Sequence, residues 1–483
     1  MRTKRDTVCH TCRRHKIGCD GKQPACTQCE FTGRKCGGYV QEMIIFHHAP
    51  PAPTPTRQET KKPGVKSNQK PLGQQFVVFG GQQCPYTDGM PPFPPTWEES
   101  VALLVQQYIP KDEIPLLGNL DGPSSRICGG WVQALFHVDQ SNANFESMLL
   151  PAARALTLSM LVADNNSQQQ YLNTYVDALQ GIRCRLAAQK EVTDNVAALA
   201  GMCLAVSEAL MPTSEDGWTS HLRGVAAMMY AQGPETFIDG ISHLLFVGFR
   251  PLIVLDSIVH RTGTFLEEES WRTIPFTKQR CSTMQDLLGY GTSIASLLEK
   301  VDRVTYEVPE ALWSLSVLDQ TLQDWETSHL QQGDVGYWPV TPNQLNLNAS
   351  LQGLPDTCFA FPNVASGNAL THCWAFRVVC LLEVMGPERS ITDEASSNNA
   401  TLNEGSWRSR ILDLTMMICQ GLPYLVQQNM GLYGPLSAAF PLGMVNKTIH
   451  RLGLQDHRIA AWHSLIQAQI VPRHGPSVNS SNR

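Results

Sequence analysis

The chain has 483 residues, of which 42% are hydrophobic and 17% are charged. A chain of this length can bury a sizeable core and can contain more than one domain. Its apolar content excludes a wholly disordered protein, and the lack of a glycine triplet period excludes a collagen-like one.

Charge is distributed unevenly along the chain. Residues 1–70 contain 14 Lys and Arg against 5 Asp and Glu, a net charge of +9, and the remaining 23 and 38 give residues 71–483 a net charge of −15. This asymmetry favours a polyanion-binding end attached to an acidic body. A basic tail without fixed structure is the alternative that charge alone leaves open.

The cysteines are also unevenly placed. Of the 15 cysteines, six fall within residues 9–36, and the other nine are scattered through mostly apolar runs, where cysteine behaves as a small core residue. Residues 1–8 are charged and lack the apolar core of a signal peptide. We therefore expect a reducing compartment, in which dense cysteines bind metal more often than they form disulfides. A disulfide framework is the less favoured alternative.

Composition divides the chain into four segments. Residues 1–40 form the cysteine-rich module. Residues 41–95 are rich in proline and lysine, which predicts a basic linker without a continuous helix. Residues 96–470 are predicted to form one large all-α domain, because helical spacing recurs there and alternating strand patterns are scarce. Residues 471–483 are polar and predicted to be a flexible tail.

Helix signals begin directly after the proline-rich segment. Thr96 followed by Glu99 is typical of a capping box. Apolar residues at helical spacing follow the capping box in three places: Val101, Leu104, Val105 and Tyr108; Leu172, Tyr175, Val176 and Leu179; Leu222, Val225, Ala226 and Met229.

The Ser- and Asn-rich segment Asp393–Glu404 is instead predicted to be a loop.

A membrane-spanning segment is not expected. A spanning helix needs about 20 predominantly apolar residues in a row. The longest charge-free stretch, Leu414–Asn446, is interrupted by glycine, proline and amide residues. It predicts buried helices joined by a turn.

The six clustered cysteines have the spacing C-x2-C-x6-C-x6-C-x2-C-x6-C, in which the unit C-x2-C-x6-C occurs twice. A two-residue gap lets two thiolates reach one metal ion from a single turn, and zinc takes four such ligands in a tetrahedron. The predicted ligands are Cys9, Cys12, Cys19, Cys26, Cys29 and Cys36.

Six thiolates serve two zinc ions fully only if two sulfurs bridge both ions. The internal repeat makes the first cysteine of each half, Cys9 and Cys26, the natural bridges. One ion then takes Cys12 and Cys19 in addition, and the other takes Cys29 and Cys36. Both sites are closed, so we expect structural rather than hydrolytic zinc, and metal binding would supply most of the folding free energy of so small a module.

The two halves differ in charge. A basic run follows the second cysteine, whereas an acidic residue, Glu30, follows the fifth. Only the first run suits a nucleic-acid groove, because Lys and Arg bond guanine O6 and N7. The predicted DNA contacts are Arg13, Arg14, His15, Lys16 and Lys22.

The module resembles the fungal binuclear zinc-cluster family of transcription factors. The resemblance is carried by the six cysteine positions together with Arg13, Lys16, Asp20 and the loop proline Pro24. It implies two Zn²⁺ ions, a nuclear location and major-groove recognition of short C-G-G triplets.

The family's base contacts come mainly from the positions that His15 and Lys16 occupy here. His15 stands where the family usually has Arg or Lys, and Gly18 replaces a common basic residue.

A weaker resemblance extends into the body. The stretch His221–Phe276 is similar to the helical regulatory domain of many such factors. It includes the motifs Gly-Pro-Glu at 233–235, Arg-Pro at 250–251 and Glu-Ser-Trp-Arg at 269–272.

Family members often dimerise through a coiled coil just after the module. No apolar heptads occur between Tyr39 and Pro95 here, so we expect binding as a monomer or as a homodimer through the helical body.

The sequence thus predicts a zinc-dependent, sequence-specific DNA-binding regulator of RNA polymerase II genes, pathway-specific and serving for example a biosynthetic gene cluster. Its helical body would receive a signal or contact the transcription machinery. The alternative is a zinc-stapled interaction or scaffold protein whose body carries the function. An enzyme is not expected, because no H-E-x-x-H, G-x-S-x-G or P-loop motif is present; catalytic and cofactor-binding residues are therefore not assigned.

Overall fold

The computed structural model describes residues 11–12, 17, 19–20, 22, 26–34, 36, 95–114, 130–161, 165–187, 195–214, 216–303, 308–347, 354–386, 398–454 and 458–470. The chain divides into two compact units, residues 1–72 and residues 73–483. We call them the module unit and the body. The division falls inside the segment predicted to be a linker.

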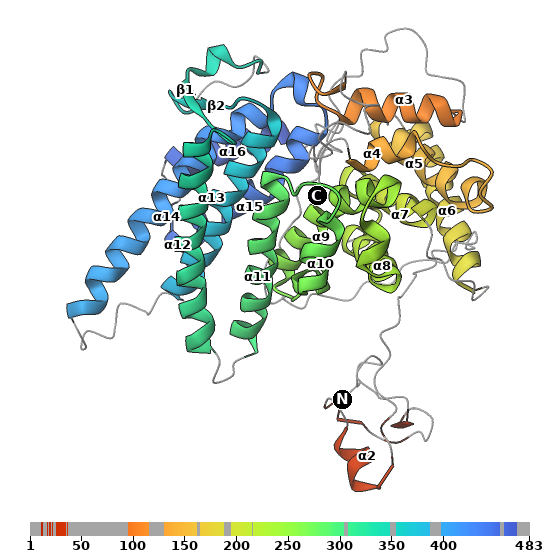
Figure 1. Cartoon of the computed structure of the whole chain (residues 1–483), viewed down its shortest axis with the longest axis horizontal. Coiled ribbons are helices and arrows are strands. Elements are labelled where there is room, and N and C mark those ends of the chain that lie inside the picture. The colour runs from red at the N-terminus through yellow and green to blue at the C-terminus, as the bar shows by residue number, and fades with distance from the viewer. Residues whose placement is uncertain are drawn as a thin grey trace, which may run out of the picture. The chain divides into compact units, whose positions relative to one another are not determined.

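The body is built almost entirely of helices, which confirms the predicted fold class (Figure 1). Its α-helices are α3 (Trp97–Tyr108), α4 (Gly130–Leu135), α5 (Leu150–Leu161), α6 (Asn165–Ala187), α7 (Asn195–Leu210), α8 (Gly217–Gln232), α9 (Gly240–His260), α10 (Glu269–Thr273), α11 (Thr283–Asp302), α12 (Val308–Gln332), α13 (Val364–Met385), α14 (Asn398–Leu425), α15 (Tyr433–Leu452) and α16 (Arg458–Ile470). Short π or 3-10 turns are η3 (Phe145–Leu149), η4 (Pro234–Phe237), η5 (Phe265–Glu267), η6 (Ile274–Phe276), η7 (Pro342–Gln344) and η8 (Gln428–Met430).

Within the described residues, the only sheet is a two-stranded one. Strand β1 (Trp338–Val340) pairs antiparallel with β2 (Cys358–Ala360), with Trp338 opposite Ala360. A two-stranded sheet gains its stability from packing against other elements. Here β2 packs against α14, and the ring of Tyr337 lies 5.6 Å from that of Trp374 on α13.

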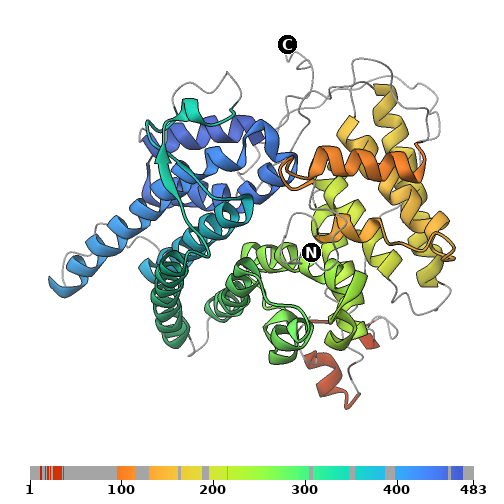
Figure 2. The same cartoon turned by 45° about the horizontal axis from the view of Figure 1, so that its top comes forward.

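The helices follow chain order across the body. Figures 1 and 2 show α3 to α8 on one side, α9 and α11 in the middle, and α12 to α16 with the small sheet on the other side. One continuous hydrophobic core joins these parts. On the side formed by α12 to α16, helix α13 is central: it packs against α11, α12, α14 and α15.

Helix α3 begins as the sequence predicts. The Oγ1 of Thr96 accepts a hydrogen bond from the amide of Glu99 at 3.2 Å, and the Glu99 carboxylate accepts one from the amide of Thr96 at 2.8 Å. This reciprocal pair satisfies two amides that have no partner inside the helix. The predicted capping box is therefore confirmed.

Helix α9 is long and apolar enough to cross a membrane, judged by length and composition alone. In the body, 72% of its most apolar window is buried, where it packs against α4, α7, α8 and α11. Core helices of soluble proteins share this composition, so the feature is weak evidence for a membrane. The stretch Leu414–Asn446 forms the end of α14, η8 and most of α15, as predicted.

One local prediction is wrong. The segment Asp393–Glu404 was expected to be a loop, but α14 begins at Asn398, and residues 387–397 lie outside the described residues. Extending an existing helix costs little, because each added residue gains a hydrogen bond without a new nucleation step. The later turns of α14 are anchored by buried residues such as Ile411 and Ile418.

A buried group of charges joins α12, α13 and α14. Arg377 on α13 donates to Asp319 and Glu326 on α12, each at 3.1 Å, and to Gln323 at 3.0 Å. Arg410 of α14 also donates to Asp319. All members of this group have partners, as buried charges require.

Candidate zinc centre and nucleic-acid interface

The second half of the cysteine repeat forms one short helix, α2 (Thr27–Phe31). Cys26 is its N-cap residue, and its carbonyl accepts hydrogen bonds from the amides of Cys29 at 3.0 Å and Glu30 at 3.2 Å. The Cys26 sulfur also accepts from the amide of Cys29, at 3.4 Å. The two-residue gap therefore wraps one turn and brings both sulfurs to one place, as the spacing predicts.

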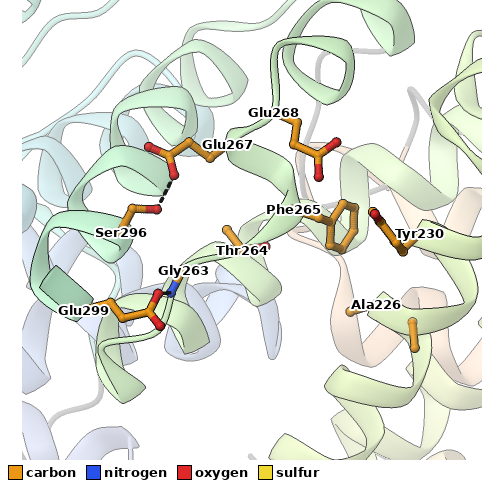
Figure 3. A pocket seen from close by; sticks show the side chains of 10 residues that line it. Ala226, Tyr230, Gly263, Thr264, Phe265, Glu267, Glu268, Ser296 and Glu299 are labelled. Carbon is orange, nitrogen blue, oxygen red and sulfur yellow. Dashed lines mark hydrogen bonds between the residues drawn. The ribbon is translucent and has the colours of Figure 1, made fainter. Parts of the chain in front are cut away.

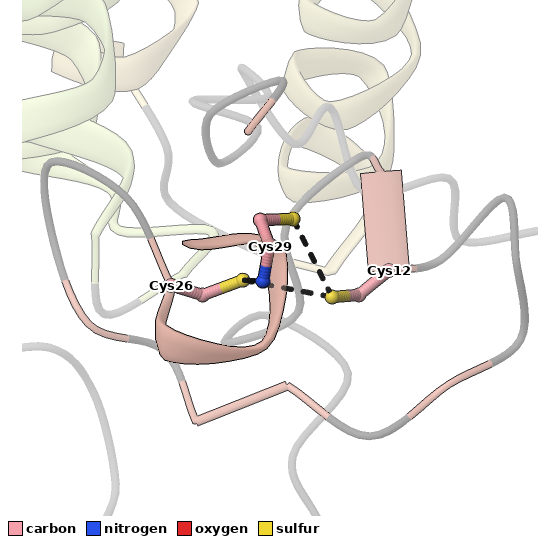
Figure 4. Close-up of side chains that lie close together, drawn as sticks. All are labelled: Cys12, Cys26 and Cys29. Carbon is pink, nitrogen blue, oxygen red and sulfur yellow. Dashed lines mark hydrogen bonds between the residues drawn. The ribbon is translucent and has the colours of Figure 1, made fainter. Parts of the chain in front are cut away.

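Three sulfurs from the two halves of the module meet in a buried cluster (Figure 4). The Sγ of Cys12 lies 3.6 Å from that of Cys26 and 3.9 Å from that of Cys29. Disulfide sulfurs would lie about 2.05 Å apart. Two thiolates on one tetrahedral zinc, each at about 2.3 Å from the ion, lie about 3.8 Å apart. The spacing of these sulfurs thus fits zinc, and none of the three residues forms a disulfide.

A second group of ligand atoms shares a member with the first. Cys19, Asp20 and Cys26 have ligand atoms within 4.8 Å of one another, as do Cys12, Cys26 and Cys29. Cys26 is therefore common to both groups. Cys36 is partly buried and packs against the same cluster.

Asp20 connects the loop after Cys19 to the start of α2. Its carboxylate accepts a hydrogen bond from the amide of Thr27 at 3.1 Å and from the Thr27 hydroxyl at 2.6 Å. These bonds favour the ionised form and lower the pKa of the Asp20 carboxyl, the Thr27 side chain being the largest cause. The carboxylate thus also stabilises the helix N-terminus.

The two halves of the repeat close in the same way. The amide of Ile17 bonds the carbonyl of Cys12 at 3.1 Å, and the amide of Arg34 bonds the carbonyl of Cys29 at 3.0 Å. Both bonds span five residues, and both start from the second cysteine of a half. A bond of this span ends a helical turn. The internal repeat of the sequence is therefore also a repeat of backbone structure.

Five of the six predicted ligands are among the described residues, and the structure brings them to one cluster: Cys12, Cys19, Cys26, Cys29 and Cys36. Cys9 lies outside the described residues, and so do the predicted DNA contacts Arg13, Arg14, His15 and Lys16. Lys22 is described and exposed.

The tie between Asp20 and Thr27 is the feature of the site that sequence reasoning missed. In the sequence, Asp20 stands out only as a position shared with the family, and no motif points to Thr27. The signal available was a carboxylate directly after one ligand and a hydroxyl residue directly after another. Recognising the pair requires knowing that the loop returns to the helix start.

Comparison with known families gives one match. The family model of the fungal Zn(2)-Cys(6) binuclear cluster domain matches residues 7–42. No curated protein and no solved structure matches the chain. The match confirms the resemblance stated for the module, whereas the similarity of residues 221–276 to a regulatory domain stays a prediction.

The matched domain and the sulfur cluster agree on the metal. A binuclear cluster domain with six cysteines binds two zinc ions, as the spacing predicts. The module thus matches a zinc-cluster domain, a domain of DNA-binding regulators that are generally nuclear.

Proposed function

We propose that this chain is a sequence-specific, zinc-dependent regulator of RNA polymerase II transcription that acts in the nucleus on the genes of one pathway. The observation that carries the proposal is the sulfur cluster of Cys12, Cys26 and Cys29, with zinc-like spacing, inside the matched domain. Recognition of C-G-G-type triplets in the major groove belongs to the same proposal.

The proposed metal ligands are the six cysteines, with Cys9 and Cys26 shared by both ions. The participation of Cys26 in both groups of ligand atoms supports its role as a bridge. Zinc coordination would supply the folding free energy that the small hydrophobic core of the module cannot provide. The residues of the chain would then hold the run after Cys12 in a fixed orientation toward DNA.

The proposed DNA contacts divide into two kinds. His15 and Lys16 would contact base edges, because they occupy the positions that face the groove in the resembling family. Arg13, Arg14 and the exposed Lys22 would contact phosphates. Phosphate contacts set affinity and its salt dependence, whereas base contacts set sequence preference. The net charge of +9 over residues 1–70 supports this division.

The domain organisation is part of the proposal. Residues 1–40 would bind DNA, residues 41–95 would tether them, residues 96–470 would act as the regulatory or effector domain, and residues 471–483 would be a flexible tail. The helical body has a continuous core of its own, as an independent domain requires. It would contact a co-regulator or the transcription machinery.

The test is selection of random duplex DNA by the zinc-loaded full chain at a defined salt concentration. We expect enrichment of C-G-G triplets, whose number and spacing report a monomer or a dimer. Failure to enrich any sequence, with two zinc ions still bound, would contradict the proposal and favour a zinc-stapled interaction protein.

Two sets of variants separate the roles of the residues. Lys16→Ala should reduce the preference for specific over random DNA, by about 1–3 kcal/mol for a lost base contact. Replacing Arg2 and Lys4 by Ala should weaken binding to all DNA sequences alike and lower the slope of affinity against salt concentration. Equal effects of both sets on specific and random DNA would contradict the assignment.

A further inference from the structure

A pocket of about 730 Å³ opens on the body between α8, the segment around η5 and α11 (Figure 3). Its volume lies within the range of small-molecule sites, and it is broadly open to solvent rather than enclosed. All of its lining residues belong to the body, and none belongs to the zinc-cluster domain. A ligand bound in this pocket would therefore not contact the residues proposed to bind DNA.

One wall of the pocket is aromatic. The rings of Tyr230 and Phe265 lie 5.3 Å apart, and Tyr230 is 56% exposed. Phe265 packs edge to face against the buried Trp271, with the two ring centroids 4.7 Å apart. Ala226 and Ala227 add a small apolar surface beside Tyr230. A ligand in this pocket would therefore meet two aromatic rings, of which Tyr230 is exposed and Phe265 is partly buried.

The remaining charged lining of the pocket is acidic. Glu267, Glu268 and Glu299 line the pocket, and none of the described lining residues is Lys, Arg or His. The Glu299 carboxylate accepts from the amide of Gly263 at 2.8 Å and pairs with Arg303, which offsets its charge. Glu267 accepts from the hydroxyl of Ser296, a neutral partner.

Of the three carboxylates that line the pocket, that of Glu268 is the best placed to bind a ligand. Its side chain makes no hydrogen bond or ion pair with the described residues, and Figure 3 shows it on the same side of the pocket as Phe265 and Tyr230. With Glu267, it leaves two negative charges without a cationic partner in the pocket. An anionic ligand would be repelled here, whereas a cation gains from both the carboxylates and the ring faces.

We propose that this pocket binds a small organic cation: an ammonium group attached to a short apolar body. The ammonium group would bond Glu268 and lie against the face of Tyr230 or Phe265, and the apolar part would cover the alanine surface of α8. The negative charge of the body, −15 over residues 73–483, would attract such a cation and repel anions.

The test is calorimetric titration of the zinc-loaded full chain with 2-phenylethylamine, which is protonated at pH 7.5. The reference is 2-phenylethanol, which has a similar shape and no charge. We expect the amine to bind at least about tenfold more tightly, and its affinity to fall as salt rises. Equal affinity for the two compounds, or no binding of the amine at millimolar concentration, would overturn the proposal.

Variants identify the pocket as the site. Glu268→Gln should weaken binding of the amine about tenfold and leave the affinity for the alcohol unchanged. Tyr230→Phe should retain binding, whereas Tyr230→Leu should weaken it by about threefold or more, because only the leucine removes the ring face. Glu310→Gln, at an exposed position at the start of α12, is the matched charge control.

Two further results complete the test. Unchanged thermal unfolding of each variant would show that lost binding is not lost folding. Binding of an oligolysine peptide that the amine does not displace would also overturn the proposal, and would assign the surface to a protein partner. DNA binding is measured on the same samples, so that failure of the proposed regulator function remains distinguishable.

Discussion

Cys26 has three structural roles in the zinc-cluster domain. It caps α2, its sulfur accepts a hydrogen bond from the Cys29 amide, and it belongs to both groups of ligand atoms. A terminal ligand would serve one ion, whereas a shared sulfur would serve two. The distinction is measurable in the number of ions that the chain retains.

We expect Cys26→Ser to lose both zinc ions, because each proposed site would be left with three sulfurs and the module would unfold. The measurement is zinc content per chain after dialysis against a weak chelator. Cys184→Ser, at an exposed cysteine in α6, is the control and should retain two ions. A variant that keeps one zinc with native affinity would contradict the bridging role.

At this scale, sequence and structure agree where the chemistry depends on local spacing. The positions of Cys12, Cys26 and Cys29 followed from the two-residue gap and the repeat alone. The bond from Thr27 to Asp20 could not be predicted in that way, since it depends on how a loop returns to a helix. The buried role of Arg377 was also hidden, because its partners lie more than 50 residues away in the chain.

Helices α12, α13 and α14 are held together by more than apolar packing. Arg377 is 8% exposed and lies between Asp319 and Glu326, and the indole of Trp374 also donates to Glu326 at 2.7 Å. Removing the cation would leave two buried carboxylates with fewer partners. A buried charge that loses its partner destabilises a fold far more than a broken surface pair does.

We expect Arg377→Met to lower the free energy of unfolding of the body by about 3–5 kcal/mol. Arg303→Met should change it by less than about 0.5 kcal/mol, since Arg303 is 67% exposed in its pair with Glu299. Urea unfolding followed by helical circular dichroism measures both.

A second variant isolates the cause. Adding Glu326→Gln to Arg377→Met should recover part of the loss, because the uncompensated charge is removed while the amide oxygen still accepts from Trp374. If the double variant were less stable than Arg377→Met, the electrostatic account would be wrong and packing would dominate.

Elements with strong local signals were predictable, and elements set by tertiary contacts were not. The start of α3 carries its own capping box, so its boundary was predictable to the residue. The start of α14 at Asn398 lies in a Ser- and Asn-rich segment that looks like a loop, and it is helical because the rest of the helix is anchored in the core. The strands β1 and β2 have three residues each, too few to show an alternating pattern.

The whole chain consists of two units that hold together for different reasons. The described part of the zinc-cluster domain has only the cysteine cluster and its immediate neighbours as a core, whereas the body has a large continuous one. Metal should therefore control the folding of one unit and leave the other almost unaffected.

We expect a strong zinc chelator to abolish DNA binding while the thermal unfolding temperature of the body changes by less than about 2 °C. Scanning calorimetry of the full chain with and without chelator, together with DNA binding on the same samples, measures both. Restoring zinc should restore DNA binding. A large fall in the unfolding temperature would instead mean that the body depends on the metal-bound domain.

The place of α9 in the middle of the body has a consequence for synthesis of the chain. Its partners α4, α7 and α8 precede it and are made first, but α11, which packs on another side of it, emerges only afterwards. Until then, a helix apolar enough to cross a membrane has one face open to water on the ribosome. Chaperones that guard nascent chains, and the machinery that sorts apolar segments to membranes, would both encounter this helix before the core closes over it.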